Sequence, residues 1–247
     1  MGNNKAKVIA ITGASSGIGE ATALKLAAAG YKIMLGARRE ERLKEITGKI
    51  TASGGQADYA ITDVTDICSV EKLAKKACSS FGRIDVWMNN AGIMPHSPFS
   101  MDRVDDWEAM IDTNLKGVLY GIHAALPIMH EQGSGQFINV ASIAAHAVHQ
   151  GGGVYSATKA GVWMISEALR QEEAANNIRV TTVSPGAIAT ELVDHMTVSE
   201  IRANTRKNFY DKLAIPAERI ADTLKLAVEL PADTTINELV IRPTAQV

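Results

Sequence analysis

Short runs of apolar and β-branched residues alternate with longer segments of helical periodicity along nearly the whole chain. Apolar runs of about 4–8 residues predict buried strands, and the longer segments between them predict helices. The predicted strands are Val8–Thr12, Lys32–Leu35, Ala57–Ile61, Asp85–Asn89, Gly135–Ala141, Ile178–Ser184 and Glu238–Arg242. The predicted helices are Ile18–Ala29, Glu40–Ser53, Ile67–Phe81, Asp105–Glu131, broken or bent near Pro127, Tyr155–Asn176 and Ile220–Leu230.

This alternation predicts an α/β fold with a parallel sheet covered on both faces. No Pro/Ser-rich linker and no internal repeat divides the chain. We therefore expect one doubly wound Rossmann domain over residues 1–247, with about seven strands and helices on both sides of the sheet.

Two predicted helices, 105–131 and 155–176, carry apolar residues on more sides than one buried face requires. A second subunit is the simplest cover for the remaining apolar surface, which predicts a homo-oligomer, either a tetramer or a dimer. The alternative is that the segment expected to cover the substrate shields these helices.

Composition narrows the classes of partner. The chain has 247 residues and a net charge of −2, so it offers no basic surface for nucleic acid. The apolar run Val8–Ile11 is too short for a membrane span or a signal sequence. Two cysteines in a chain of this length indicate reduced thiols in a cytoplasmic protein. We expect neither nucleic acid nor membrane as a partner.

A glycine-rich loop follows the first predicted strand and opens the first helix. Its glycines, Gly13, Gly17 and Gly19, have the spacing Gly-x-x-x-Gly-x-Gly. Glycines let a backbone turn tightly and approach a pyrophosphate, whose charge then faces a helix N-terminus. The loop predicts dinucleotide binding, and the alternative is a structural turn without a ligand.

The end of the second strand predicts which dinucleotide binds. An acid there would bind the ribose 2′-hydroxyl of NAD, whereas arginine accommodates the 2′-phosphate of NADP. Arg38 and Arg39 stand at this point, and no acid precedes them. They predict NADP(H). The alternative is that both arginines only solvate a loop beside Glu40 and Glu41.

Tyr155 and Lys159 are four residues apart in a predicted helix, so their side chains share one face. An ammonium stabilises the ionised form of a nearby phenol, and we therefore expect a lowered pKa at Tyr155. Such a phenol can exchange protons with a substrate. The pair alone is weak evidence, because tyrosine and lysine meet by chance on many helices.

With these features together, the chain resembles the short-chain dehydrogenase/reductase family over nearly its whole length. The matching positions are the glycine loop, Asn89-Asn90-Ala91-Gly92, Asn114, Ser142, Tyr155-x-x-x-Lys159, and Pro185-Gly186 with Thr190. A narrower likeness, to the NADP-dependent clavulanate dehydrogenase-like branch, lies in residues 36–39, 190–192 and 241–244.

The resemblance implies roles for four residues in catalysis. Tyr155 is the expected acid/base, Ser142 steadies the substrate oxygen, and Lys159 holds the nicotinamide ribose. Asn114 supports a water that links Lys159 to solvent. With the loop and the arginines included, the expected cofactor-binding residues are Gly13, Ser15, Ser16, Gly17, Ile18, Gly19, Arg38, Arg39, Asp63, Val64, Asn90, Ala91, Gly92, Tyr155, Lys159, Pro185, Gly186, Ile188 and Thr190.

These roles predict an NADPH-dependent carbonyl reductase, which is a secondary-alcohol dehydrogenase run in reverse. The alternatives are a 3-oxoacyl-thioester reductase or 3-hydroxy acid dehydrogenase and, outside enzymes, an NADP-binding redox sensor. His146 and His149 flank the catalytic segment without partners at metal-ligand spacing, so no metal is expected.

Three segments should line the substrate pocket, 93–99, 143–153 and a lid over 187–215 with Glu191, Leu192, His195 and Met196. The glycines Gly151–Gly153 favour a roomy or mobile pocket, which would suit a bulky ketone. The sequence leaves open the substrate, its stereochemistry, the preferred direction, and whether Ala145 and these glycines are natural or engineered.

Overall fold

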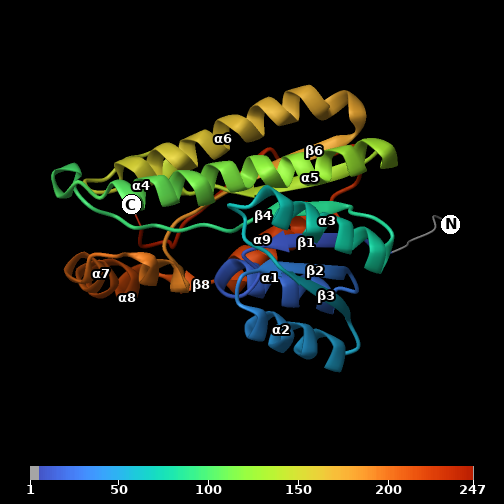
Figure 1. The fold of residues 1–247 in the computed structure, drawn as a ribbon, viewed down its shortest axis with the longest axis horizontal. Helices are drawn as coiled ribbons and strands as arrows, with labels where there is room; N and C mark the ends of the chain where they lie inside the picture. The colour runs from blue at the N-terminus through green and yellow to red at the C-terminus, as the bar shows by residue number, and fades with distance from the viewer. Residues whose placement is uncertain (1–5, 247) are drawn as a thin grey trace.

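The computed structural model describes residues 6–246 and arranges the chain in three layers, with helices on both sides of one sheet (Figure 1). All seven strands of this sheet are parallel, in the order β3-β2-β1-β4-β5-β6-β9. The strands are β1 Val8–Thr12, β2 Lys32–Ala37, β3 Gln56–Ile61, β4 Val86–Asn89, β5 Gly135–Val140, β6 Ile178–Pro185 and β9 Glu238–Ile241. The predicted doubly wound Rossmann fold in a single domain is confirmed.

The order of the strands fixes where a ligand can bind. β1 pairs with β2 on one side, Val8 opposite Lys32, and with β4 on the other, Ile9 opposite Val86. The chain therefore winds in opposite directions on the two sides of β1. In such sheets a crevice opens at the carboxyl ends of the strands where the direction reverses.

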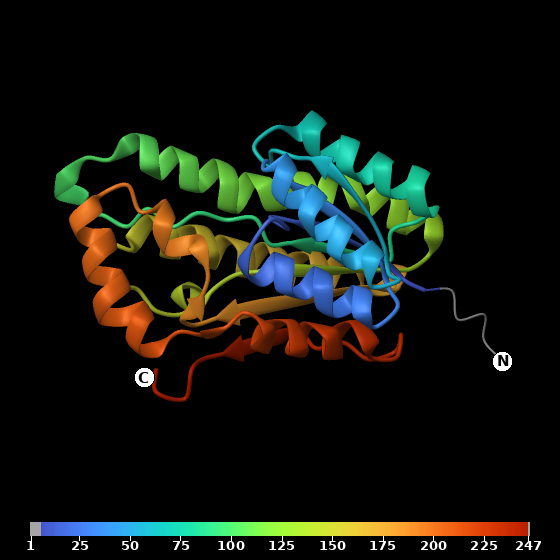
Figure 2. The same ribbon diagram turned by 90° about the horizontal axis from the view of Figure 1, so that it is seen from below.

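Two sets of helices cover the sheet. One face carries α1 Gly17–Ala28, α2 Glu40–Ala52 and α9 Glu218–Glu229, and the other carries α3 Ile67–Phe81, α5 Gly117–Gln132 and α6 Gly153–Glu173. Figure 2 shows α9 beside α1. On the first face Leu26 and Leu224 join the strand residues in the core. On the second face Trp87 and Phe137 are fully buried against α3 and α5.

The helix predicted over residues 105–131 is interrupted, but not at Pro127, which lies inside α5. It consists of α4 Val104–Met110, a π-helical turn Ile111–Lys116, and then α5. A π turn is wider than an α turn, and it is frequent at functional sites. Asn114 lies in this turn.

The segment 187–215, expected as a lid over the substrate, contains secondary structure of its own. Its ends are joined by a two-stranded sheet of β7 Ile188–Ala189 and β8 Ile215–Pro216. Between them lie three short helical turns and α7, all beyond the end of the main sheet (Figure 1): the 3-10 turn Glu191–His195, α7 Ser199–Thr205, the π turn Arg206–Tyr210 and α8 Asp211–Leu213. We call residues 187–216 the lid segment.

Some apolar side chains of α5 and α6 are exposed, as expected for helices that are apolar on more than one side. Leu119 of α5 is 44% exposed and Met164 of α6 is 64% exposed. The lid segment packs against Met110 near the start of the predicted helix 105–131 but leaves Leu119 and Met164 uncovered, so the alternative considered above holds only for that part. Among residues 6–246, no helix has both the length and the apolar character needed to cross a membrane.

Candidate active site

A cleft of about 600 Å³ opens at the carboxyl ends of the strands and is bounded by the lid segment. Its walls bring together all but two of the predicted site residues: Gly13, Ser15, Ser16, Gly17, Ile18, Arg38, Arg39, Asp63, Val64, Asn90, Ala91, Gly92, Ser142, Tyr155, Lys159, Pro185, Gly186, Ile188 and Thr190. Gly19 and Asn114 do not line it. Both lie behind the wall and support it.

The glycine loop has the backbone that its sequence predicts. Gly13 and Gly17 have positive φ values of 64° and 56°, where a side chain would be strained. A Cβ on Gly13 would also lie 2.7 Å from the Cα of Ala91. Gly19 is needed for packing, since a Cβ there would collide with the carbonyl oxygen of Gly13. Asn90 fastens the loop, because its Nδ2 donates to the carbonyl of Gly13 at 3.1 Å.

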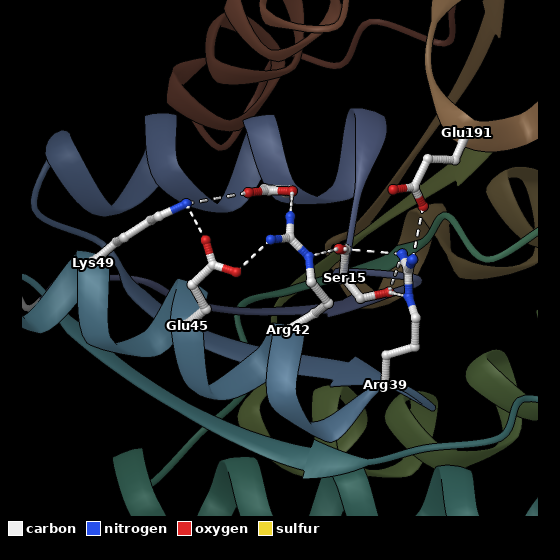
Figure 3. A network of polar contacts seen from close by, with 7 residues as sticks. Ser15, Arg39, Arg42, Glu45, Lys49 and Glu191 are labelled. Carbon is white, nitrogen blue, oxygen red and sulfur yellow. Dashed lines mark hydrogen bonds and ion pairs between the residues drawn. The ribbon is translucent and has the colours of Figure 1, made fainter.

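A polar network ties the lid segment to the glycine loop (Figure 3). Arg39 Nη1 lies 2.8 Å from the carboxylate of Glu191, and Arg39 Nη2 donates to Ser15 Oγ at 3.0 Å. Arg42 lies beside this pair, donating to the Ser15 carbonyl at 3.4 Å and forming an ion pair with Glu20 at 2.8 Å. Arg39 therefore connects the loop that would hold a pyrophosphate with the segment that would close over it.

The two arginines at the end of β2 differ in their surroundings. Arg38 is exposed at the cleft and, within residues 6–246, forms no ion pair, unlike Arg39. Glu40 and Glu41, which could have explained both arginines, pair with Lys44 instead. Arg38 is thus the guanidinium that a phosphate can reach without first displacing a carboxylate.

Asp63 and Val64 form the wall expected for the adenine. Burial disfavours the charged form of Asp63, but hydrogen bonds from Thr65, at 2.8 and 3.0 Å, outweigh it. With the charge of Arg38 they hold the pKa of Asp63 below its usual value. The carboxylate is therefore charged at neutral pH and fixed in position.

Tyr155 and Lys159 lie on the same face of α6, and both side chains are buried. The ammonium of Lys159 donates to the carbonyl of Val140 at 2.8 Å, which anchors α6 to the end of β5. It lies 5.8 Å from the centre of the Tyr155 ring. The expectation that the two side chains come together is met.

The protonation of this pair differs from our expectation. Burial raises the pKa of Tyr155, the nearby Tyr210 adds to the rise, and a hydrogen bond with Ser142 opposes it. Burial also lowers the pKa of Lys159 to about 8. The expected lowering at Tyr155 is therefore wrong for the protein by itself, because desolvation outweighs the attraction of an ammonium at this distance.

Ser142 follows β5 and caps the short turn Ile143–Ala145. Its Oγ accepts from the amide of Ala144 at 3.1 Å and lies 3.5 Å from the carbonyl of Pro185. The hydroxyl donates to that carbonyl only at the limit of a hydrogen bond, and Tyr155 is a second partner within its reach, so it can turn to donate to a ligand that lies against Tyr155. This is the property that the predicted role requires.

Asn114 holds the loop after β4 in place through hydrogen bonds to its backbone. Its Oδ1 accepts from the amide of Ile93 at 2.9 Å, and its Nδ2 donates to the carbonyl of Ile93 at 2.9 Å and to Thr158 at 3.2 Å. A Cβ on Gly92 would lie 3.3 Å from Asn114 Oδ1 and 3.5 Å from Lys159 Nζ. Asn114 thus approaches Lys159 across a glycine, while fixing the wall of the cleft.

Some residues of the cleft were not singled out from the sequence, and one of them, Gln246, lies outside every expected segment. Gln246 lies near the end of the chain, yet its Oε1 accepts from the amide of Ala187 at 2.8 Å. Its side chain fills the space that a side chain on Gly186 would need. Tyr210 and His96 also line the cleft, within the segments 187–215 and 93–99 that were expected to do so. Met196, expected there, is instead fully buried and does not line it.

The histidines near the catalytic segment have separate surroundings. His149 lines the cleft, and His146 bonds Glu238 at 2.7 Å. In the part of the chain that the structure describes, no three His, Cys, Asp or Glu side chains gather as a metal site would require.

The residues of the cleft fit a dinucleotide. A helix N-terminus and two glycines without Cβ atoms face the place for a pyrophosphate, and an arginine lies at the end of β2. A buried phenol and a serine hydroxyl meet at its other end. Fold and site together define a dinucleotide-dependent enzyme of the Rossmann class.

Comparison with known proteins identifies the family within this class of enzymes. A family model described as short chain dehydrogenase matches residues 7–200, and the chain belongs to this family. It is an oxidoreductase of the family: an uncharacterized oxidoreductase of Staphylococcus saprophyticus is 47% identical, over 100% of this chain and 99% of the relative.

Two solved structures extend the likeness to the whole fold. One is an alcohol dehydrogenase of the archaeon Thermococcus sibiricus complexed with 5-hydroxy-NADP, 30% identical with a TM-score of 0.88, covering 98% of this chain and 99% of that one. The other is the closed form of a serine dehydrogenase complexed with NADP+, 32% identical with a TM-score of 0.89, covering 97% and 96%.

Proposed function

We propose that the protein is an NADPH-dependent carbonyl reductase that reduces a ketone to a secondary alcohol. The observation that carries this proposal is the meeting of Tyr155, Ser142 and Lys159 in the same cleft as the glycine loop and Arg38. This arrangement combines a proton donor, a second hydrogen-bond donor and a place for a nicotinamide cofactor.

Tyr155 and Ser142 have different roles at the substrate oxygen. Tyr155 is protonated at neutral pH, because burial raises its pKa, and it is ready to give its proton to a forming alkoxide. Ser142 donates a second hydrogen bond, so the developing charge is stabilised by donors already in place. Bound NADPH would supply the hydride.

Lys159 stabilises the ionised form of Tyr155. With a pKa of about 8 it is mostly charged at neutral pH, and its field favours the phenolate that remains after proton transfer. Its bond to the Val140 carbonyl leaves further ammonium hydrogens for a ribose hydroxyl. Asn114 keeps the facing wall in place and, as its family role implies, supports a water beside Lys159.

NADP(H) is the proposed cofactor. Arg38 is exposed at the cleft without an ion pair among residues 6–246, and Arg39 lies across the glycine loop. Planar guanidinium groups pair well with phosphate oxygens. The two similar solved structures are complexes with NADP+ and an NADP derivative, which supports this choice.

Reduction of a 3-oxoacyl thioester or oxidation of a 3-hydroxy acid is the second candidate, and likeness to a serine dehydrogenase favours the acid. Against it, the arginines and lysine that line the cleft, Arg38, Arg39 and Lys159, all lie on the cofactor side. A carboxylate would lack a cationic partner beyond Tyr155. A redox sensor without turnover has less support still, since the catalytic residues are all present.

Three further properties are part of the proposal. The lid segment closes over the substrate, the protein forms a homo-oligomer through α5 and α6, and it acts in the cytoplasm. The narrower likeness to the clavulanate dehydrogenase-like branch also stays a prediction.

The test is a panel of aryl ketones, diketones, 3-oxo esters and 3-hydroxy acids, assayed with NADPH and NADH side by side. We expect ketone reduction with a clear preference for NADPH. Replacing Tyr155→Phe should reduce turnover by about 10²–10⁴-fold, the range for a lost acid catalyst. It should weaken cofactor binding much less than turnover, because the other cofactor-binding residues remain in place. Equal rates with both cofactors would contradict the role of the arginines, and a panel without turnover would contradict the function.

A further inference from the structure

Tyr210 is a hydroxyl donor placed next to the catalytic tyrosine without a strong partner of its own. It ends the π turn of the lid segment and packs in one apolar cluster with Tyr155 and Met94. Within residues 6–246, the hydrogen-bond partner of its Oη is the sulfur of Met94, at 3.9 Å. A thioether is a weak acceptor, so this hydroxyl retains its capacity to bind a ligand.

Burial keeps Tyr210 protonated. It raises the pKa of Tyr210 to about 12, so the side chain stays a neutral donor over the whole range in which enzymes of this kind are assayed. Tyr210 also contributes to the raised pKa of Tyr155, and the two side chains pack in the same cluster. A group bound by Tyr210 would therefore sit beside the reacting carbonyl.

His96 brings a second polar group to the same place. Its ring meets the Tyr155 ring edge-on, with the centroids 5.4 Å apart. Its Nε2 is buried and has no hydrogen-bond partner in the described chain. A buried polar atom without a partner costs free energy, which a ligand can recover by bonding to it. Burial and the neighbouring His149 lower the pKa of His96 to about 4, so the ring is neutral at pH 7.

The glycine before α6 leaves room beside this histidine. A Cβ on Gly152 would lie 3.6 Å from His96 Nε2 and 3.5 Å from its Cε1. Nothing but hydrogen occupies that position, and the φ of Gly152, −102°, does not itself demand glycine. A side chain at this position would pack directly against the imidazole and 3.3 Å from the carbonyl oxygen of His149, so the small residue keeps this side of the nitrogen uncrowded.

The remaining walls of this end of the cleft carry no formal positive charge. They combine the apolar residues Met94, Ile143, Leu192 and Phe209 with the neutral polar residues Asn204, Thr205 and Asn208, whereas the arginines and Lys159 lie toward the cofactor. A neutral donor and a neutral imidazole in such surroundings favour an uncharged polar group over a carboxylate.

We propose that Tyr210 and His96 form a second polar anchor that selects substrates with an uncharged hydroxyl or carbonyl group next to the ketone that is reduced. Tyr155 and Ser142 hold the reacting oxygen, and Tyr210 and His96 hold the neighbouring one. The substrate class is then the hydroxy ketones and diketones. This inference rests on the proposed function, and it specifies the substrate of the same site.

The test compares butanone with acetoin, which adds one hydroxyl next to the ketone. For each variant the measured quantity is the ratio of kcat/KM for acetoin to kcat/KM for butanone, so that general losses cancel. Losing one neutral hydrogen bond costs about 0.5–1.5 kcal/mol, or roughly two- to twelvefold. We expect Tyr210→Phe and His96→Phe each to lower the ratio by an amount in that range.

The controls separate binding from packing. Both substitutions keep an aromatic ring, and Tyr31→Phe removes a hydroxyl at the start of β2, at the opposite end of the sheet, so its ratio should equal that of the wild type. The KM for NADPH should be unchanged in all three variants. If Tyr210→Phe and His96→Phe leave the ratio within about twofold of the wild type, or lower both rates equally, the anchor does not exist.

A binding measurement keeps this inference distinct from the proposed function. Butanone and butane-2,3-dione carry no alcohol that the oxidised cofactor could oxidise, and without NADPH they cannot be reduced, so calorimetry on that complex gives their dissociation constants without turnover. Tighter binding of the dione than of butanone, lost in Tyr210→Phe and His96→Phe, supports the anchor even if no ketone is reduced. Equal binding of the two ketones by the wild type overturns it.

Discussion

Burial determines the protonation states of the catalytic pair, Tyr155 and Lys159. Tyr155 and Lys159 are both pushed toward their neutral forms, the phenol upward in pKa and the ammonium downward, to about 8. Their spacing in the sequence predicts that they meet, since position on a helix is a local property. The directions of their pKa shifts could not be predicted in this way, because desolvation depends on the strands and lid that enclose the pair.

Lys159 should make stability depend on pH in a defined direction. The folded protein holds this lysine with a pKa of about 8 instead of 10.5, so between these values the unfolded chain binds more protons. The free energy of unfolding therefore gains a contribution that rises with pH in this window. Lys159→Met removes it. In urea unfolding, the stability of the wild type relative to this variant should increase from pH 7.5 to pH 9.5. A constant difference would show that Lys159 is not destabilised by burial.

Among the elements, those that are regular were predictable and those that shape the site were not. The strands and main helices follow from apolar runs, but the π turn around Asn114 has no periodic signature of its own. The lid segment is polar and apolar without a clear period, so its β7–β8 pair and its short helices were missed. That pair joins residues about 27 positions apart, and pairings at such distance depend on tertiary structure.

The ion pair between Arg39 and Glu191 couples the lid segment to cofactor choice. Arg39 has to give up this carboxylate before it can bind a 2′-phosphate fully. We expect Glu191→Gln to tighten NADP+ binding, by roughly the 2–5-fold that an exposed ion pair is worth, with no change for NAD+. Fluorescence titration with both cofactors measures this. As a control, Glu45→Gln removes an ion pair of Arg42 that lies farther from the cleft. It should change the binding of neither NADP+ nor NAD+. Equal changes for NADP+ and NAD+ would indicate a general effect on the lid.

At the scale of the whole molecule, the two ends of the chain contribute to one site. The glycine loop follows the first strand, and Gln246 reaches back to the lid segment at Ala187. Motif positions at strand ends made most of the cleft predictable, because the ends of parallel strands meet at one edge. His96 and Tyr210 lie in the segments 93–99 and 187–215, which the sequence already places at the pocket. Which of their side chains meet Tyr155, and that Gln246 reaches the same cleft, depends on the complete fold and could not be predicted.

The exposed apolar residues of α5 and α6 lead to a prediction about assembly. Leu119 and Met164 are 44% and 64% exposed, and placing charge on them should oppose contact with a second subunit. We expect Leu119→Lys with Met164→Lys to give a smaller particle in light scattering than the wild type. Ile67→Lys, at a residue 37% exposed on α3, is the matched control and should not change the mass. A wild-type monomer would remove the basis for the proposed oligomer.

The π turn also bears on how this site can arise or be lost. A π turn accommodates one residue more than an α-helical turn does, with hydrogen bonds from i to i+5 in place of i+4. A single insertion in an ordinary helix therefore suffices to create it, and a single deletion to remove it. Shortening Ile111–Lys116 by one residue would leave a continuous helix from α4 to α5, while Asn114 would lose its approach to Ile93. Changes in length at this point would spare the fold and alter the chemistry.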